Sequence, residues 1–275
     1  MIAIRIQSLT KSYGERLALC GIDLEVPKGQ VLGYIGPNGA GKSTTVRILT
    51  GALLPSQGTV EVAGFDVVKQ PLEVKRRIGY VPEVAALYES LSPAEYLAFV
   101  AGVHGLDEAT AACRIAALLE VLGLTERLDT PMSGFSKGMR QRVAIAAALI
   151  HDPEVVILDE PLSGLDAHAA ILLKEIVLRL SRTGRTIFYC SHQLDVVERV
   201  CHRVVILNRG RIEADGEPEE LIRRSRESSL EAVFRELTSQ ADFAELAARF
   251  VAALSLAGER RLASGAPLTN EGKGS

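Results

Sequence analysis

The sequence predicts an α/β protein with a parallel β-sheet at its centre. Two runs, residues 155–158 and 186–190, are almost entirely apolar, which is typical of strands buried on both faces of a parallel sheet. A third apolar run, residues 31–35, precedes a glycine-rich loop and then a helix-like segment at residues 46–49. Ligands of open α/β sheets bind at the carboxyl ends of the strands. We therefore expect a binding site where these runs end.

The glycine-rich loop is the first candidate site. It consists of Gly36, Pro37, Asn38, Gly39, Ala40, Gly41, Lys42, Ser43 and Thr44. The spacing G-x-x-x-x-G-K-S between a strand and a helix is that of a phosphate-binding loop. Its glycines allow backbone conformations in which successive N–H groups point at an anion beside a helix N-terminus. Lys42 would reach the β- and γ-phosphates of a nucleotide, and Ser43 would offer its hydroxyl to Mg²⁺.

Alternating segments around this loop predict a small antiparallel sheet. Residues 2–6 and 22–26 alternate apolar and polar side chains on either side of a turn at residues 13–15, and residues 58–64 add a further strand. Tyr13 stands in this turn, and two interpretations of it stay open. Its ring stacks on a nucleotide base, or it covers the edge of the sheet.

Residues 84–150 predict a helical subdomain inserted between strands. A strand that begins near Arg77 leads to Glu83, which places a carboxylate at the end of that strand. Residues 92–95, Ser-Pro-Ala-Glu, then match a capping box with proline in the first helical turn. A second amphipathic helix is expected over residues 107–122.

A second candidate for anion binding lies at residues 133–142, just before an alanine-rich helix that ends near residue 150. Ser136 and Gly138 stand where this helix begins, and a helix N-terminus with a serine cap favours anions. An ordinary capped helix explains the same residues, and on this segment alone it is the simpler interpretation.

Polar residues follow both buried strands. Asp159 and Glu160 come directly after residues 155–158, and His192 follows residues 186–190. Parallel strands end at the same sheet edge, so these side chains are expected to lie near the phosphate-binding loop. An acid pair can also be solvated or cap the next helix, and a single histidine is usually structural. Downstream of a phosphate-binding loop we favour catalytic roles for all three.

The C-terminal part of the chain predicts a helix at residues 167–180, a hairpin at 204–214 and then charged helical sequence. We expect a nucleotide-binding domain over residues 1–222 and a helical extension over 223–262, which includes an amphipathic stretch at about 241–261. The last residues, 263–275, are small and polar, a composition typical of disorder.

Charge and cysteine content exclude several classes of protein. The 31 basic residues are interleaved with 34 acidic ones, and the net charge of −3 gives no sign of a nucleic-acid surface. No stretch approaches the ~20 apolar residues of a membrane span, and no secretory signal opens the sequence. Without C-x-x-C spacing, the cysteines indicate buried thiols in a reducing compartment. They are Cys20, Cys113, Cys190 and Cys201.

Taken together, these motifs resemble the ATP-binding cassette (ABC) family over about residues 1–240. The resemblance implies a P-loop NTPase with a RecA-like parallel core, an antiparallel β subdomain and an inserted helical subdomain. It identifies residues 36–44 as the Walker A loop, Tyr13 as the adenine-stacking aromatic, and residues 163–166 as the D-loop. It implies Asp159 as the Walker B aspartate, Glu160 as the catalytic carboxylate and His192 as the switch histidine. Residues 135–139 match the ABC signature, and Glu83 ends the Q-loop strand.

Two positions depart from the usual family pattern. The signature, commonly Leu-Ser-Gly-Gly-Gln, is here Phe-Ser-Lys-Gly-Met, which keeps Ser136 and Gly138 but places Lys137 between them. The usual Q-loop glutamine is Glu83, whose carboxylate can still face Mg²⁺. Both variants look like those of bacterial export-type cassettes, as does the segment 230–237.

The resemblance implies an ATPase that uses ATP and Mg²⁺ and is active as a pair of cassettes, with Ser136 and Gly138 of one closing on the nucleotide of the other. Lys42, Glu160 and His192 are the expected catalytic residues, and Ser43, Glu83 and Asp159 the expected metal ligands. The expected partner is a membrane-embedded permease that works in export, which would hold this cytoplasmic chain at the inner face of the membrane. No nucleic-acid partner is expected. The alternative is a soluble ABC-type ATPase acting on nucleic acid or ribosomes, which RNA or DNA stimulation of the ATPase would reveal.

Overall fold

The computed structural model describes residues 1–238 and 246–251. The chain divides into two compact units, Met1–Leu237 and Thr238–Ser275. In the second unit, residues 246–251 are helical with exposed side chains. The amphipathic stretch predicted at 241–261 lies mostly outside the described residues, and the predicted disordered tail at 263–275 lies wholly outside them.

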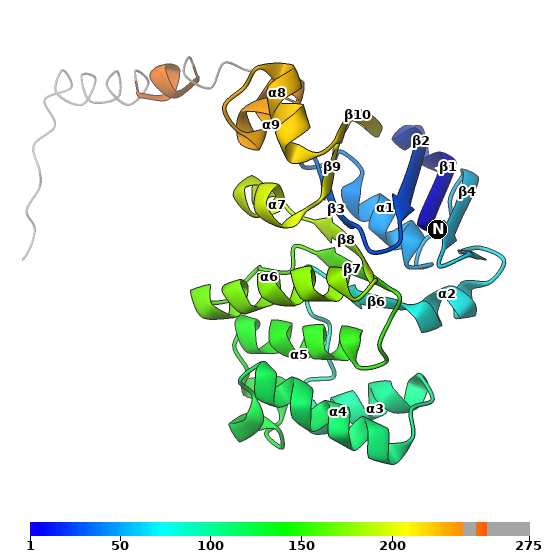
Figure 1. The fold of residues 1–275 in the computed structure, drawn as a ribbon, viewed down its shortest axis with the longest axis vertical. Helices are drawn as coiled ribbons and strands as arrows, with labels where there is room; N and C mark the ends of the chain where they lie inside the picture. Colours follow the sequence, from blue (N-terminus) through cyan, green and yellow to red (C-terminus); the bar gives the residue numbers. More distant parts are fainter. Residues whose placement is uncertain (239–245, 252–275) are drawn as a thin grey trace, which may run out of the picture. The chain divides into compact units, whose positions relative to one another are not determined.

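A six-stranded sheet forms the centre of the first unit (Figure 1). Its order is β10 (Arg211–Gly216), β9 (Arg203–Asn208), β3 (Val31–Ile35), β8 (Thr186–Cys190), β7 (Val155–Asp159) and β6 (Ile78–Val81). All neighbours are parallel except the β9–β10 hairpin. Every residue of β3, β7 and β8 is buried, which confirms the predicted core strands.

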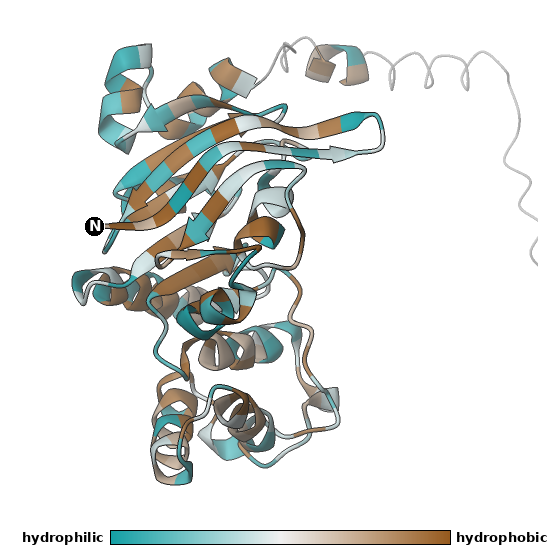
Figure 2. Ribbon diagram, turned by 90° about the vertical axis from the view of Figure 1, so that its right-hand side faces the viewer, coloured by the Kyte–Doolittle hydropathy of each residue, from teal (hydrophilic) through white to brown (hydrophobic). Residues whose placement is uncertain are grey.

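A four-stranded antiparallel sheet packs beside it, in the order β2 (Arg16–Pro27), β1 (Ile2–Tyr13), β4 (Gln57–Val62) and β5 (Phe65–Asp66). Figure 2 shows apolar and polar residues alternating along its strands, because one face is buried and the other is solvated. Helix α1 (Lys42–Leu49) joins both sheets in one hydrophobic core through Val46, Ile48 and Leu49. The glycine-rich loop that precedes α1 is therefore held from both sides.

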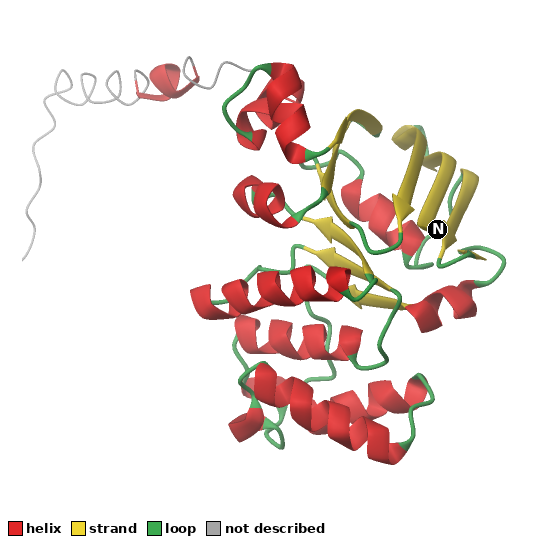
Figure 3. Ribbon diagram, in the orientation of Figure 1, coloured by secondary structure: helices red, strands yellow, loops and turns green. Residues whose placement is uncertain are grey.

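Helices cover the other face of the parallel sheet (Figure 3). They are α6 (Ala167–Arg182), α7 (Leu194–Val200), α8 (Pro218–Ser225) and α9 (Leu230–Thr238). Leu173 and Val177 of α6 and Val197 of α7 are buried against this face. This second core fixes the carboxyl ends of β7 and β8, where the predicted catalytic residues stand.

The inserted helices form a third core. They are α3 (Pro93–Val103), α4 (Glu108–Val121), the short turns η1 (Thr125–Arg127) and η2 (Met132–Gly134), and α5 (Lys137–Leu149). At the start of α3, Glu95 N donates to Ser92 Oγ at 3.2 Å and Ser92 N donates to Glu95 Oε2 at 2.8 Å. The predicted capping box is confirmed, and it sets where the helical subdomain begins.

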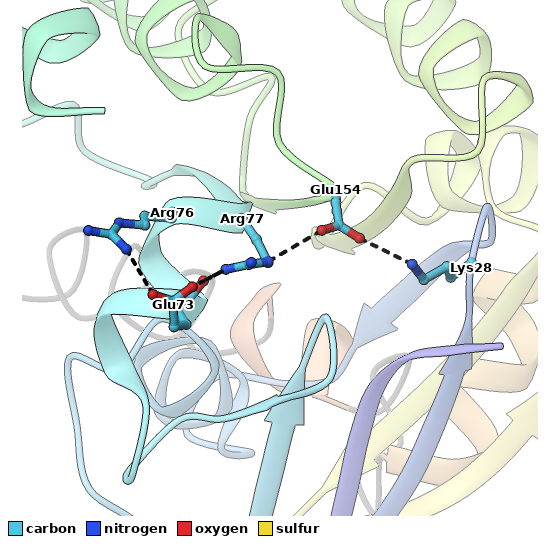
Figure 4. A network of polar contacts seen from close by, with 5 residues as sticks. All are labelled: Lys28, Glu73, Arg76, Arg77 and Glu154. Atoms are coloured by element: carbon cyan, nitrogen blue, oxygen red, sulfur yellow. Dashed lines mark hydrogen bonds and ion pairs between the residues drawn. The ribbon is translucent and has the colours of Figure 1, made fainter. Parts of the chain in front are cut away.

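Figure 4 shows a chain of ion pairs among Lys28, Glu73, Arg76, Arg77 and Glu154. Lys28, Arg77 and Glu154 come just before β3, β6 and β7, so these pairs lie at the opposite end of the strands from the glycine-rich loop. Glu154 pairs with Lys28 at 3.1 Å and with Arg77 at 3.5 Å. Arg77 also pairs with Glu73 of α2 (Pro71–Arg77) at 2.6 Å, and Arg76 pairs with the same carboxylate at 2.8 Å. All these side chains are partly exposed, so each pair contributes at most about 1 kcal/mol. The network links α2 to Glu154 and Lys28 and contributes little to the free energy of unfolding.

The cysteines are only partly as predicted. Cys190 and Cys201 are buried, and burial raises the pKa of both thiols. Cys113 is exposed on α4 and Cys20 is half-buried, so the prediction of four buried thiols is wrong for these two. The reason for Cys113 is that α4 packs only one face, through residues such as Ala111 and Leu119, against the helical core.

Two histidines stack where the helical subdomain meets the parallel sheet. The rings of His104 and His151 lie 3.7 Å apart between centroids and 13° from parallel. His151 Nε2 contacts the carbonyl oxygen of Ile78 at 2.9 Å, and His151 Nδ1 is buried without a hydrogen-bond partner. Burial, followed by the charge of His104, lowers the pKa of His151 to about 4. Burial also lowers the pKa of His104.

This pair predicts an acid-sensitive contribution to stability. The pKa values of both histidines in the folded protein lie below the unfolded value of about 6.5. The neutral, packed rings therefore make their full contribution to the free energy of unfolding above pH 6.5. It is lost as the pH falls toward 4, since the unfolded chain binds protons first. We expect the free energy of unfolding to fall between pH 7 and pH 5 by about 1 kcal/mol more in the wild type than in His151→Gln, a figure discounted for the partial exposure of the rings. Urea denaturation at both pH values measures this, and equal losses in the two proteins would contradict the assignment.

Candidate nucleotide-binding site

The glycine-rich loop requires glycine at two positions for reasons of space. A Cβ at Gly36 would lie 2.3 Å from the carbonyl oxygen of Leu207 on β9. A Cβ at Gly41 would lie 2.6 Å from Leu19 Cδ2, and Gly41 also has a φ of 114°, which L side chains rarely adopt. The backbone of the loop is thus pressed between β9 and the antiparallel sheet. Its conformation is fixed by packing on both sides.

The lysine of the loop folds back over it. Lys42 Nζ donates to the carbonyl oxygen of Gly36 at 2.5 Å and to that of Pro37 at 3.2 Å. Behind the loop, Thr45 Oγ1 donates to the carbonyl oxygen of Gly41 at 3.2 Å and lies 3.1 Å from the hydroxyl of Tyr34. The ammonium group is therefore held over the loop, beside the N-terminus of α1, where anions bind.

A cavity of about 320 Å³ opens above the loop. It is lined by Tyr13, Arg16, Ala18, Asn38, Gly39, Gly41, Lys42, Ser43 and Thr44. Tyr13, at the end of β1, is about half-exposed there. The other predicted residues, Gly36, Pro37 and Ala40, belong to the same loop and lie outside this lining.

Two lining residues were missed by the sequence analysis. Arg16 and Ala18 lie on β2, just after the turn that carries Tyr13. The register that pairs Tyr13 with Arg16 brings both side chains to one end of the hairpin. The short turn at residues 14–15 was the available signal, because residues that flank a tight turn lie opposite each other.

The acid pair lies at the carboxyl end of β7, as predicted. Asp159 is 8% exposed. Burial, and then the negative charges of Glu160 and Glu83, raise the pKa of Asp159 to about 6, while Lys42 and Arg47 lower it. The predicted residues Asp159, Glu83 and Lys42 are therefore close enough to influence one another, although Glu83 itself is exposed beyond the end of β6.

Glu160 is held in a fixed position. Its backbone has a φ of 47°, and its N–H donates to the carbonyl oxygen of Cys190 at 2.9 Å. Ser191 Oγ donates to Glu160 Oε2 at 3.1 Å, and His192 Nδ1 lies 2.9 Å from Glu160 Oε1. The side chain of His192 is otherwise 74% exposed. Ser191 is buried and was not predicted as a site residue, because its role depends on the neighbouring strand.

The signature residues lie elsewhere in the chain. Ser136 caps α5, with its Oγ accepting from Met139 N at 3.2 Å, and its own side chain is exposed. Gly138 is buried, and a Cβ there would lie 2.5 Å from the carbonyl oxygen of Gly164. Among the residues that line the cavity in the described part of the chain, none comes from 133–142. One chain alone does not bring Ser136 or Gly138 to the phosphate-binding loop.

This arrangement suits a phosphate chain with a hard cation. The loop supplies backbone N–H groups and an ammonium group, and Asp159 and Glu160 supply carboxylates at the carboxyl end of β7, which is what a charged polyphosphate with a cation requires. Within residues 1–238 and 246–251, no three His, Cys, Asp or Glu side chains gather into a ready-made metal site. In the same residues, no helix is long and apolar enough to cross a membrane.

Comparison with known proteins agrees with this geometry. The family model described as "ABC transporter" matches residues 19–163. The chain is 38% identical over 221 residues to the linearmycin resistance ATP-binding protein LnrL of Bacillus subtilis, covering 80% of this chain and 71% of LnrL. It is 37% identical over 219 residues to the Nod factor export ATP-binding protein I of Cupriavidus metallidurans, covering 80% and 72% respectively.

Solved structures give the same result. An ATP-binding subunit of an ABC transporter superposes with a TM-score of 0.82 at 34% identity, covering 86% of this chain and all of that one. The predicted fold class, a P-loop NTPase with an antiparallel β subdomain and inserted helices, is confirmed. The family match spans more than half of the sequence and contains the phosphate-binding loop and the acid pair. The chain therefore belongs to the ABC transporter family, as an ATP-binding and ATP-hydrolysing subunit.

Proposed function

We propose that this chain powers a separate membrane permease by hydrolysing ATP at two sites, each shared between two cassettes. One observation carries the proposal. The phosphate-binding loop and the acid pair share one edge of the sheet, whereas Ser136 lies exposed on α5, away from the cavity. A second cassette in head-to-tail arrangement supplies Ser136 and Gly138 to the nucleotide of the first. The positive end of the α5 dipole then faces the phosphates.

The metal ligands proposed are Ser43, Asp159 and Glu83, acting on Mg²⁺. Burial, and then the negative charges of Glu160 and Glu83, raise the pKa of Asp159, and a bound cation would favour its charged form. Mg²⁺ keeps several waters and takes only one or two carboxylates together with phosphate oxygens, so a dense protein ligand set is not required. When bound, the ion neutralises charge on the β- and γ-phosphates. Lys42 supplies the matching positive charge from the loop.

Glu160 is the proposed general base, which orients the attacking water and accepts its proton. Ser191 fixes one carboxylate oxygen and leaves the other to His192. Because the His192 side chain is largely exposed, it can turn to contact the γ-phosphate. Tyr13, at the mouth of the cavity, stacks on the adenine.

Export is the proposed direction of transport. The relatives include one named for linearmycin resistance and one named for Nod factor export. These names favour a transporter subunit over the nucleic-acid alternative, as does the net charge of −3. The chain would lie on the cytoplasmic side of the membrane through its permease. Residues 1–222 would form the cassette and 223–262 a helical extension.

We assign the permease contact to a groove between the Q-loop and the helical subdomain. The groove has a volume of about 290 Å³. It is lined by Ile78, Tyr80, Pro82, Ala85, Ala86, Leu87, Tyr96, Val100, His104, Ala144, Ala147, Ala148 and His151. Beside it, Tyr88 is 62% exposed and packs edge-on against Tyr96 and Phe99. A groove of this composition fits the apolar face of a short helix.

One prediction of this proposal concerns the general base. In Glu160→Gln the amide cannot accept the proton, so we expect ATP binding to be kept and turnover to fall by about 10² or more. The variant should accumulate as an ATP-bound dimer. Steady-state hydrolysis and light scattering after gel filtration measure both effects, with Glu213→Gln on the exposed face of β10 as a control. Hydrolysis near the wild-type rate would contradict the role of Glu160.

Another prediction concerns the permease. Phe99→Asp puts a charge in the exposed aromatic cluster, so the tagged chain should no longer recover a multi-span protein from detergent-solubilised membranes, while ATP binding stays unchanged. Leu72→Asp, at an exposed apolar position of α2, is the control and should still recover it. Mass spectrometry identifies the retained protein. Recovery by Phe99→Asp equal to that by Leu72→Asp would exclude the aromatic cluster beside the groove as a permease contact, and recovery of ribosomes or nucleic acid instead would favour the alternative function.

A further inference from the structure

Lys137 makes a contact that connects two loops of the site. Its Nζ donates to Ser163 Oγ at 2.7 Å, which joins the signature segment to the D-loop of the same chain. The aliphatic part of Lys137 lies across Gly164, where a Cβ would come within 2.9 Å of Lys137 Cγ and Cδ. Gly164 also has a φ of 80°. The glycine thus leaves room for the lysine chain, and the serine receives its ammonium group.

Two further contacts join the same segments. Gln141, which is 1% exposed, donates from Nε2 to the carbonyl oxygen of Pro161 at 3.3 Å. The backbone of Gly138 lies directly against the carbonyl oxygen of Gly164. The first turn of α5 and residues 161–164 are therefore packed as one body, and Lys137 is its outermost link.

Helix stability does not explain a lysine at this position. Lys137 is the first residue of α5, and the first turn contains no acidic side chain. A cation at a helix N-terminus opposes the helix dipole. The usual family signature has glycine here, so the ammonium group is a departure from that pattern. Its hydrogen bond to Ser163 is the interaction that accounts for it.

A further hydrogen bond connects Ser163 to the backbone of the catalytic glutamate. Ser163 N donates to the carbonyl oxygen of Glu160 at 3.0 Å, and Glu160 N is itself bonded to Cys190. Two hydrogen bonds thus separate the ammonium group of Lys137 from the backbone of Glu160. These contacts form a continuous path from the signature segment through residues 161–164 to the backbone of Glu160.

We propose that Lys137 is a positioning residue that couples the two ATP sites of the dimer. This rests on the proposed function, in which Ser136 and Gly138 close on the nucleotide of the partner cassette. Through Ser163, closure on the partner's nucleotide then fixes the backbone of Glu160 in the chain's own site. Each site is thereby made competent by the nucleotide in the other.

The test compares Lys137→Met, Ser163→Ala, their double variant and the conservative Ser163→Thr. Met keeps the aliphatic packing on Gly164 but lacks the ammonium group. The full-length chains are assayed for ATP hydrolysis against ATP concentration, and for the dissociation constant of a fluorescent ATP analogue. Lys75→Met, at an exposed position of α2, is the control for loss of a lysine charge.

We expect the Met and Ala variants each to lower the Hill coefficient from near its limit of about 2 toward 1, and to lower kcat about five-fold. The double variant should be no worse than either single variant, because both changes remove the same bond. Ser163→Thr keeps the hydroxyl, so its Hill coefficient and kcat should match those of the wild type. Affinity for the analogue should change less than about two-fold, since the phosphate-binding loop is untouched.

Three results would overturn the inference while leaving the proposed function intact. The first is a Hill coefficient in Lys137→Met equal to that of the wild type. The second is a double variant whose loss of kcat is the product of the two single losses. The third is a loss of kcat in Lys137→Met that Ser163→Ala does not share. The last would mean that the ammonium group acts on the phosphates directly. A wild-type Hill coefficient of 1, with Glu160→Gln monomeric in saturating ATP, would contradict the shared-site proposal and this inference with it.

Discussion

The close approach of the Gly36 backbone to the carbonyl oxygen of Leu207 is the constraint on which the site depends. It requires that β9 lie beside β3 in the parallel sheet, and that no side chain stand between them. On the other side, Leu19 of the antiparallel sheet presses on Gly41. The loop is therefore shaped before any nucleotide arrives. Preorganised N–H groups bind phosphate without the cost of ordering a mobile loop.

The electrostatics of the site follow from that placement. Asp159 is buried next to two other carboxylates and is held with a raised pKa of about 6, while Lys42 is bonded to carbonyl oxygens of its own loop. A bound Mg²⁺–nucleotide would supply charges opposite to both groups, with the cation near Asp159 and the phosphates near Lys42. Ser136 of the same chain is exposed and lies outside the cavity, which favours function as a pair.

Much of this could be predicted from the sequence, where local pattern determines structure. The uninterrupted apolar runs of β7 and β8 and the spacing of residues 36–44 are local signals, and the structure has the predicted elements there. Ser191 and the stacked His104 could not be assigned, because their partners come from distant segments brought together only by packing. Arg16 could have been assigned from the tight turn that follows Tyr13. The exposure of Cys113 was missed for a similar reason: an apolar neighbourhood in sequence does not say which helix face is covered.

The most direct test of the account is calorimetric titration of ATP with Mg²⁺ into the wild type and Lys42→Met. The account predicts one ATP bound per wild-type chain. It predicts affinity at least about ten-fold weaker in the variant, because a charge-assisted contact to phosphate contributes about 1.4 kcal/mol or more. The melting temperature of the two proteins should be similar, since Lys42 is partly exposed. Equal affinity in both proteins, or no binding to the wild type, would contradict it.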